Sequence, residues 1–510
     1  MRDGWRRTRR GAGHEDGRRR AAPVPSTGRL APNTSIVERE RTDPMKIRLA
    51  VCAGAAALGV CAGTVGAAAA PPLGAGAGAG PARIPRAPVS AGAPVSAGAT
   101  AAGATATGAR AAGMTTTGMT TTGTTATGTT APEGPGAARL QAALDGVHRA
   151  GMPGVFAEVR ADGRTWRGAS GVADLATGRP VRADMRHRVG SITKTFTAAA
   201  VMQQVEQGRI RLDAPIGDYL PELVPGERGR RVTVRMLLNH TSGIPDHIRY
   251  AFPSLQELPS PTAITSLDEN RFRRFRPAEL IELGLAAPPA GEPGGPVGVY
   301  SNTNYLILGQ LLERVTGMPY ETYVARHVIA RAGLRHTGFP TGPRIEGPHS
   351  RMYEALFGVV AEPHEYSVYD MSWVGPGAAL VSTVEDLDRF YGRLLAGRVV
   401  SRASLAQMQR TGPVIALDGT TIQYGLGLTR LEVPGCGTYW GQDGTAWGAG
   451  TRSMTRSDGR RQVSVALNLQ RWNALDASGR PRPHPIDAAL ETLFERAMCG
   501  DTNASGADGR

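Results

Sequence analysis

A long run of small residues limits how much of this chain can fold. Residues 71–133 consist almost entirely of Gly, Ala, Thr and Pro. Such a segment buries too little apolar surface to offset the conformational entropy lost on folding. We therefore expect a flexible linker at 71–136. Folding is then confined to one domain at 137–500, which is large enough for a stable core, with a disordered tail at 501–510.

A predicted export signal precedes the linker. The chain from Met45 has a basic start at Lys46 and Arg48, followed by an uncharged stretch over 49–65 and small residues at 68–70. This layout is typical of a secretory signal peptide, which we assign to 45–70. A transmembrane anchor is the alternative, but the stretch is short and poor in large apolar residues. We expect no permanent membrane anchor and a secreted, extracellular protein, with association with the cell wall as a further option.

Positive charge is concentrated near the start of the chain. Half of the formal net charge of +14 falls within residues 1–48. Residues 1–44 are expected to be a disordered basic leader or an artefact of a start codon chosen too far upstream. The excess in the domain is modest and no basic run alternates with aromatic residues, so nucleic-acid binding is not expected. Attraction to an anionic cell wall is the alternative to a plain preference for arginine.

The chain has four cysteines, and two of them, Cys52 and Cys61, fall in the predicted signal peptide. Cys436 and Cys499 remain. An exported chain folds in an oxidising compartment, so this pair predicts a disulfide, with two unrelated buried thiols as the alternative. No cluster of His, Cys and acidic residues has metal-ligand spacing, so we predict no metal and no cofactor.

Hydrophobic patterning predicts an α+β fold. Apolar and polar residues alternate over 154–174 around Asp162-Gly163 and over 448–470 around Asp458-Gly459, two hairpin signals. The intervening segments expected to be helical, several of them ended by glycine, are 191–207, 233–239, 277–284, 303–316 and 384–396. This order predicts an antiparallel β-sheet built from both chain ends and flanked by helices, with an inserted, mostly helical lobe.

Lysine is nearly absent from the chain. Of 58 basic residues only Lys46 and Lys194 are Lys, and only Lys, not Arg, can release its proton in a protein. Lys194 ends the segment Ser191-Ile192-Thr193-Lys194, at the start of a predicted helix, where residues three apart share a face. Serine is a weak nucleophile that needs an adjacent base, and a buried neutral amine can serve. The alternative is an N-capping Ser191 followed by a surface lysine.

A second polar segment, Tyr300-Ser301-Asn302, precedes another predicted helix. A phenol beside an ammonium is expected to shift towards phenolate and to move protons, and the amide of Asn302 can hold a substrate carbonyl. A capped turn is the alternative. His240 is expected to be a structural hydrogen-bonding residue, and Trp373 to line the cleft or to pack.

Taken together, these motifs resemble the serine D-alanyl-D-alanine carboxypeptidases and the class C β-lactamase-like hydrolases. The resemblance spans about 138–500 and rests on SITK, LLNHTSG, YSN, YGLGL and the Cys436/Cys499 pair. It implies a β-lactamase/transpeptidase-like fold and an acyl-enzyme on Ser191. Lys194 and Tyr300 would then shuttle protons while Asn302 binds substrate. The backbone N–H groups of Ser191 and Thr445 would form the oxyanion hole.

The third motif departs from the family pattern of Lys or His, then Thr or Ser, then Gly. This chain has Gln442-Asp443-Gly444-Thr445, predicted to line the substrate. An acid at 443 is expected to repel a substrate carboxylate, offset by Arg430 or, with the spacing shifted by one, by Thr429. Three outcomes follow: a preference for esters, amides or cationic peptides; a carboxypeptidase with Asp443 turned outwards; or a site that binds without turnover.

The resulting functional prediction is a secreted, monomeric serine hydrolase that acts on small-molecule substrates. The leading interpretation is a D-alanyl-D-alanine carboxypeptidase or β-lactamase-like hydrolase acting on cell-wall peptides or β-lactams. An esterase or D-amino-acid amidase on the same fold is the first alternative, because fold does not determine function. A non-catalytic cell-wall peptide-binding protein is the second.

Overall fold

The computed structural model describes residues 135–500. The predicted leader, signal peptide and tail, and the linker up to residue 134, lie outside the described residues. The strands are β1 (Gly154–Ala161), β2 (Arg164–Asp174), β3 (Arg179–Pro180), β4 (His187–Arg188), β5 (Gly298–Val299), β6 (Tyr353–Glu354), β7 (His364–Glu365), β8 (Val381–Ser382), β9 (Gly412–Ile415), β10 (Thr421–Tyr424), β11 (Thr429–Val433), β12 (Gly437–Ala446), β13 (Ala449–Arg456), β14 (Arg461–Leu467) and β15 (Leu469–Gln470).

The α-helices are α1 (Pro135–Arg149), α2 (Thr193–Glu206), α3 (Gly226–Arg231), α4 (Val234–Leu238), α5 (Ile248–Ala251), α6 (Thr265–Glu269), α7 (Pro277–Ala286), α8 (Asn302–Thr316), α9 (Tyr320–Val324), α10 (Val384–Leu395), α11 (Arg402–Met408) and α12 (Pro485–Cys499). Each of the five predicted helical segments coincides with one of them. The segment predicted at 191–207 begins as a 3₁₀ turn, η1 (Gly190–Ile192), and continues as α2.

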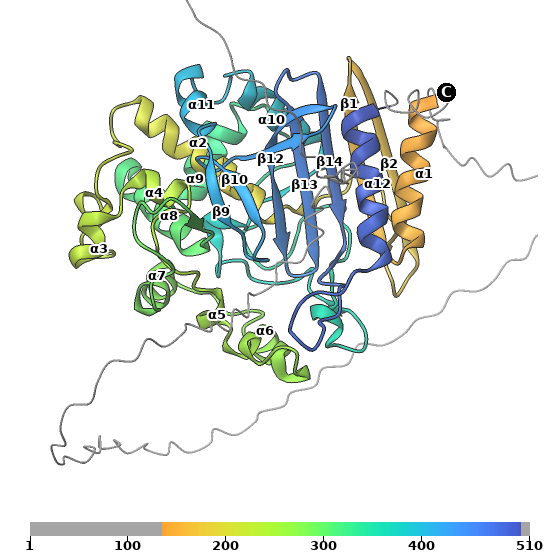
Figure 1. Ribbon diagram of the computed structural model, residues 1–510, viewed down its shortest axis with the longest axis horizontal. Coiled ribbons are helices and arrows are strands. Elements are labelled where there is room, and N and C mark those ends of the chain that lie inside the picture. Colours follow the sequence, from red (N-terminus) through yellow and green to blue (C-terminus); the bar gives the residue numbers. More distant parts are fainter. Residues whose placement is uncertain (1–134, 501–510) are drawn as a thin grey trace, which may run out of the picture. The chain divides into compact units, whose positions relative to one another are not determined.

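A ten-stranded sheet forms the centre of the fold, in the order β3-β2-β1-β14-β13-β12-β11-β10-β9-β5 (Figure 1). The first long strand of the domain, β1, pairs antiparallel with β14 from its other end, with Val155 opposite Leu467. The two predicted hairpins are β1–β2 and β13–β14. The prediction of an antiparallel sheet built from both chain ends is therefore confirmed. It is wrong only at the edge, where β5 and β9 pair in parallel.

Two helices cover one face of this sheet. α1 and α12 run side by side, with α1 over β2 and β1 and α12 over β14 (Figure 1). Leu144, Leu490 and Phe494 from these helices join Val463 and Val465 of β14 in one buried cluster. The sequence analysis named neither helix, although both belong to the layer that closes the sheet.

The opposite face holds the helix that positions the candidate nucleophile. Every residue of α2 from Thr193 to Gln204 is buried. A helix that is buried all round belongs to the interior of a large core. Phe196 of α2 stacks on Phe390 of α10 with ring centroids 3.7 Å apart. The start of α2 is therefore held rigidly between the sheet and the helical lobe.

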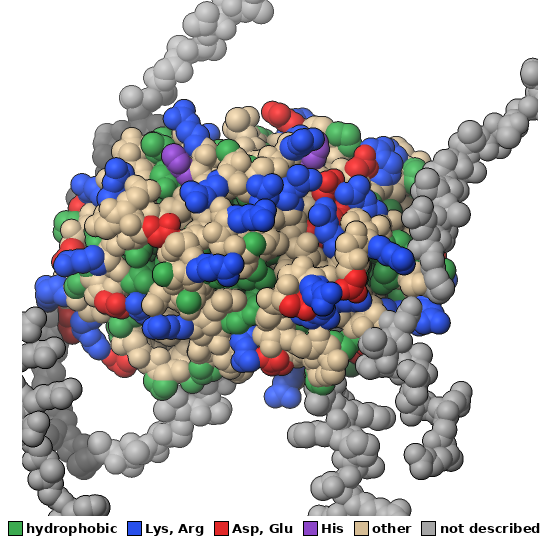
Figure 2. All heavy atoms as spheres, turned by 90° about the horizontal axis from the view of Figure 1, so that it is seen from above, with side chains coloured by type: hydrophobic (Ala, Val, Ile, Leu, Met, Phe, Trp, Pro, Cys, Tyr) green, Lys and Arg blue, Asp and Glu red, His purple; other side chains and the backbone are tan. Residues whose placement is uncertain are grey.

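Between β4 and β9 the chain is mostly helical and contains only the two-residue strands β5 to β8. The predicted inserted lobe is thus confirmed. Seen from above, basic and acidic side chains are interspersed over the face shown in Figure 2. Within residues 135–500, no helix is long and apolar enough to span a membrane.

Cys436 and Cys499 form the predicted disulfide, with Cα atoms 5.0 Å apart. Cys499 is the last residue of α12 and Cys436 directly precedes β12. The bond therefore ties the covering helix to the strand that carries residues 442–445.

We predict that C436S/C499S lowers the free energy of unfolding by about 4 kcal/mol, because the bond closes a loop with a sequence separation of 63. Urea unfolding measures the difference. Reduced wild-type protein is the matched control and should unfold like the variant, whereas equal stability of oxidised and reduced protein would contradict the prediction.

Candidate active site

The Ser191 hydroxyl and the Lys194 amine face each other at the start of α2. Lys194 Nζ lies 3.1 Å from Ser191 Oγ. It also donates to Asn302 Oδ1 at 2.7 Å and to the Gly377 carbonyl at 3.1 Å. A neutral amine has two N–H bonds and one lone pair. When Asn302 and Gly377 accept the two N–H bonds, the lone pair is left for the serine proton.

Burial prepares Lys194 for this role. Its side chain has no solvent exposure, and burial lowers its pKa to about 7, although Asp246 acts in the opposite direction. Desolvation penalises the charged form of an amine, so a large fraction is neutral near neutral pH. The alternative of a surface lysine is excluded by this burial.

Asn302 is held in one orientation by Asp246. Its backbone N–H and its Nδ2 both donate to Asp246 Oδ2 at 2.7 Å. The amide oxygen must therefore point towards Lys194. Sequence analysis expected Asn302 to bind substrate; the structure places it at the pocket and also makes it a positioning partner of Lys194. Asp246 was missed, although it lies only three residues after the LLNHTSG motif.

Tyr300 lies beside Ser191 and Lys194, with Lys194 Nζ 4.9 Å from its ring centroid. Burial raises the pKa of Tyr300 well above its ordinary value, and Tyr424 adds to the shift, while Ser191 and Gln442 oppose it. The expected shift of the Tyr300 pKa towards phenolate is therefore wrong, because desolvation outweighs the hydrogen bonds that favour the charged form. Tyr300 is a protonated phenol, suited to donate a proton.

His240 supports Tyr300 from behind. The two rings are 4.1 Å apart, and His240 Nδ1 lies 3.2 Å from the backbone nitrogen of Ser301, which donates to it. Burial, with Lys194 as a second cause, lowers the pKa of His240 well below its usual value. The ring is thus a neutral hydrogen-bonding residue at this site.

Gln442 of β12 faces the phenol of Tyr300 from the sheet side. Its Nε2 donates to the Tyr424 hydroxyl at 3.2 Å, and its Oε1 accepts from Thr429 Oγ1 at 2.6 Å. Gln442 is buried and neutral. Where the resembling family has a cation, this side of the cleft has amide and hydroxyl groups.

The structure corrects the prediction for Asp443. Arg452 on β13 is directly opposite and donates two hydrogen bonds, of 2.7 and 2.6 Å, to the Asp443 carboxylate. Arg452 in turn lies over the Phe494 ring of α12. Because the charge is already compensated, Asp443 does not repel a substrate carboxylate, and replacing it by Thr would leave a buried arginine without this partner. The orientation of Asp443 is therefore the one expected in the second outcome, in which its side chain is turned outwards. This orientation does not by itself decide the reaction.

The structure also corrects the prediction for Arg430. Its guanidinium pairs with Glu432 on the same strand and its side chain is 40% exposed. Thr429, the alternative position, is the residue that contacts Gln442. Alternation along β11 separates the two neighbours, so Arg430 is not part of the pocket.

Two glycines bring β12 against the start of α2. A Cβ added to Gly190 would lie 2.3 Å from the Thr445 nitrogen, and Gly190 has φ +52°. A Cβ on Gly444 would lie 2.7 Å from the Ser191 nitrogen. Only glycine permits this approach, which places the predicted oxyanion donors, the N–H groups of Ser191 and Thr445, close together.

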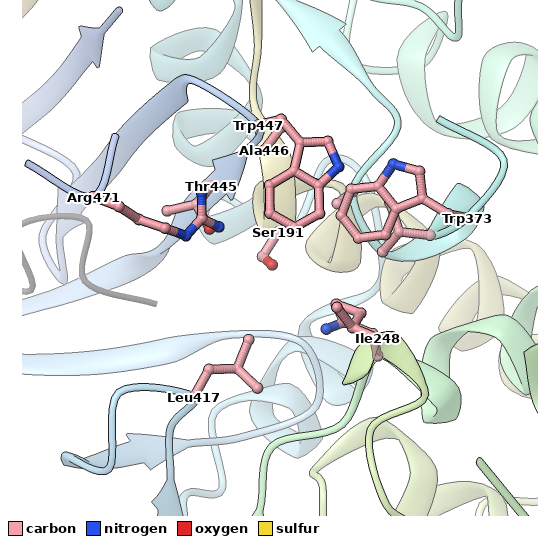
Figure 3. A pocket seen from close by; sticks show the side chains of 11 residues that line it. Ser191, Ile248, Trp373, Leu417, Thr445, Ala446, Trp447 and Arg471 are labelled. Atoms are coloured by element: carbon pink, nitrogen blue, oxygen red, sulfur yellow. The ribbon is translucent and has the colours of Figure 1, made fainter. Parts of the chain in front are cut away.

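A narrow apolar pocket opens beside Ser191 (Figure 3). Trp373 and Trp447 form one wall, with rings stacked 5.1 Å apart. The other lining residues include Ile248, Val374, Leu417, Ala378 and Arg471. Trp447 and Arg471 were missed by sequence analysis. Trp447 lies two residues after Thr445, in the turn between β12 and β13, whereas no local signal marked Arg471.

Comparisons with known proteins identify the family of this chain. Residues 137–486 match the family described as Beta-lactamase. A solved D-stereospecific amidohydrolase from Streptomyces sp. has 32% sequence identity and a TM-score of 0.60, covering 71% of this chain and 98% of that one. Penicillin-binding protein 4 of Amycolatopsis lactamdurans is 30% identical over 59% of this chain and 70% of its own length. Esterase EstB of Burkholderia gladioli is 33% identical over 40% of this chain and 51% of its own.

The sheet with its inserted helical lobe, together with an alcohol, a buried amine and a phenol at its edge, is typical of the penicillin-recognising serine hydrolases. The chain belongs to the β-lactamase family, and the resemblance seen in its motifs is confirmed.

We predict that kcat/KM rises with pH around a midpoint of about 7, because Lys194 accepts a proton only when neutral and its pKa is lowered to about 7. Below the midpoint Lys194 is an ammonium without a lone pair. Above the midpoint it is a neutral amine that can accept the proton. Lys194→Arg should abolish turnover, since a guanidinium stays protonated. Measuring kcat/KM for a neutral ester over a range of pH values tests the predicted midpoint. A midpoint near the ordinary lysine pKa would contradict the prediction.

Proposed function

We propose that the chain is an exported acyl-serine hydrolase that cleaves amide or ester bonds next to an aromatic or large apolar acyl group. The single observation that carries the proposal is the contact of 3.1 Å between Ser191 Oγ and the fully buried amine of Lys194, whose pKa is lowered to about 7. A hydroxyl beside such a base is an activated nucleophile.

The proposed reaction uses these groups in two stages. Ser191 Oγ attacks the substrate carbonyl carbon while its proton passes to the Lys194 lone pair. The resulting oxyanion is stabilised by the N–H groups of Ser191 and Thr445. As the C–N or C–O bond breaks, Tyr300 gives its phenol proton to the leaving group and regains one from Lys194. Water, with its proton taken by the same groups, then hydrolyses the ester and frees Ser191.

Tyr300 marks the leaving-group side of the cleft. Because its phenol protonates the leaving group, that group lies beside Gln442 and Thr429, which are neutral, while Asp443 is paired with Arg452. Gln442 and Thr429 carry no positive charge that could compensate a free carboxylate buried beside them. This favours leaving groups without a terminal carboxylate, as in esters, amides and internal peptide bonds.

The acyl group then occupies the opposite side, in the pocket formed by Trp373, Trp447 and Ile248. Stacked indoles suit an aromatic or large apolar side chain. The similarity to the D-stereospecific amidohydrolase from Streptomyces sp. supports an amide-cleaving enzyme of this kind. We therefore propose a D-amino-acid amidase or esterase as the first candidate function.

A D-alanyl-D-alanine carboxypeptidase or β-lactamase is the second candidate. It is supported by the 30% identity to Penicillin-binding protein 4 and by the shared fold. The neutral environment of Gln442 argues against it, since such a peptidase must accommodate a terminal carboxylate.

A matched pair of substrates separates the two candidates. We predict that a peptide ending in D-Ala-D-Ala amide is hydrolysed at least about tenfold faster, as kcat/KM, than the same peptide with a free carboxylate, because one uncompensated buried charge costs several kcal/mol. A tenfold preference for the free acid would establish the carboxypeptidase instead.

The control for that experiment is Ser191→Ala, which should lose at least about 10³-fold in turnover. Intact mass after incubation with a penicillin then shows whether a Ser191-dependent adduct forms. Absence of turnover and adduct in the wild-type protein, combined with binding of wall fragments, would support the non-catalytic alternative.

We predict that Trp447→Ala lowers kcat/KM for a D-phenylalanine ester at least about tenfold more than for a D-alanine ester, because only the larger side chain reaches the indole wall. Trp166→Ala, on β2 and away from the pocket, is the matched control and should change the two esters equally. Equal losses in Trp447→Ala would show that the acyl group does not lie against Trp447.

A further inference from the structure

Arg471 is a buried guanidinium in the wall of the Ser191 pocket. It directly follows β15, and its side chain is only 6% exposed. The guanidinium carbon lies 4.8 Å from the centre of the Trp447 ring. In Figure 3 its charged end points into the pocket beside Thr445. Arg471 therefore meets the side of the cleft that takes the acyl group.

The charge of Arg471 is balanced by Glu354. Arg471 Nη1 donates to Glu354 Oε2, and the Glu354 side chain has no exposure. The carboxylate also accepts the backbone N–H groups of Gly448 at 3.1 Å and Leu356 at 3.0 Å. With both oxygens occupied, Glu354 is not free to bind a substrate ammonium.

The backbone around this pair is held in an unusual conformation. Arg471 has φ +53°, in the left-handed region that non-glycine residues rarely adopt, and Phe357 has φ +62°. The Phe357 N–H donates to the Arg471 carbonyl at 2.7 Å, which locks the two segments together. Such strain persists where the surrounding structure imposes it, often at binding sites.

The guanidinium still has hydrogen-bonding capacity to spare. Within residues 135–500, Arg471 Nε is buried and has no hydrogen-bond partner. Buried polar groups are normally satisfied, so an unsatisfied donor in a pocket wall indicates a ligand acceptor. Its partner should be neutral, because Glu354 already compensates the positive charge and a second carboxylate would be buried unbalanced.

We propose that Arg471 is a specificity-determining residue that binds a neutral carbonyl oxygen on the nitrogen side of the acyl residue. The preferred substrate is then N-acylated or peptidyl, not an amino acid derivative with a free amine. An ammonium at that position would face the Arg471 guanidinium, which has no acceptor and carries the same charge. This inference rests on the proposed hydrolase function and names the substrate class of the same site.

Two esters that differ in one group test it: D-phenylalanine methyl ester and its N-acetyl derivative, at neutral pH. Wild-type protein is expected to show at least about tenfold higher kcat/KM for the N-acetyl ester, the usual effect of one charge-assisted hydrogen bond. Hydrolysis of both esters without this preference, or with a preference for the free amine, overturns the inference alone. Hydrolysis of neither overturns the proposed function and the inference with it.

Glu354→Gln/Arg471→Met removes both charges together, so that no unpaired charge remains buried. The preference should fall to within about twofold, while Arg430→Met, which removes an exposed guanidinium outside the pocket, should retain it. A thermal melt checks that the double variant is folded. If it is not, Arg471→Lys replaces it in the test. This variant keeps the charge but not the planar guanidinium, so the preference for the N-acetyl ester should fall in part. An unchanged preference in every folded Arg471 variant overturns the inference.

Discussion

The burial of a single amine underlies the rest of this site. Lys194 has no exposure to solvent, and Asn302, Gly377 and Ser191 surround its nitrogen. Burying a lysine is costly, and the protein reduces that cost by lowering the pKa to about 7. Asp246 orients Asn302, and α2 is buried from Thr193 to Gln204. Asn302 and Gly377 of the lobe thus hold the Lys194 amine next to Ser191.

The sheet contributes a second constraint, the close contact of β12 with the start of α2. Gly190 and Gly444 allow the two backbones to approach, and the disulfide of Cys499 with Cys436 secures the same strand to α12. After Thr445 the chain leads to Trp447, and thus to the proposed acyl pocket. Before Thr445 lies Gln442, on the proposed leaving-group side. The strand therefore lies between an apolar environment at Trp447 and a polar but neutral one at Gln442. This arrangement is the basis for proposing an amide or ester substrate.

Sequence reasoning reached the hairpins, the central helices and the Ser191–Lys194 pair because each depends on local spacing. Two-residue alternation and glycine stops determine strands and helices within a few residues, and a separation of three brings side chains together on a helix. It was wrong about Asp443 and Arg430 because strand pairing decides their environments. Arg452 reaches Asp443 across a hairpin, and alternation along β11 turns Arg430 towards Glu432. The pKa direction of Tyr300 was wrong because burial is a property of the whole fold.

By itself, the sequence determined the family and the fold class and predicted the nucleophile and its base, since these depend on short motifs and on hydrophobic period. Only the tertiary structure decided which groups surround them. Glu354 and Arg471 are 117 residues apart, yet they meet because β6 and β15 pair in parallel. Electrostatic and packing effects act over a few ångströms in space, and distance along a chain does not report that separation.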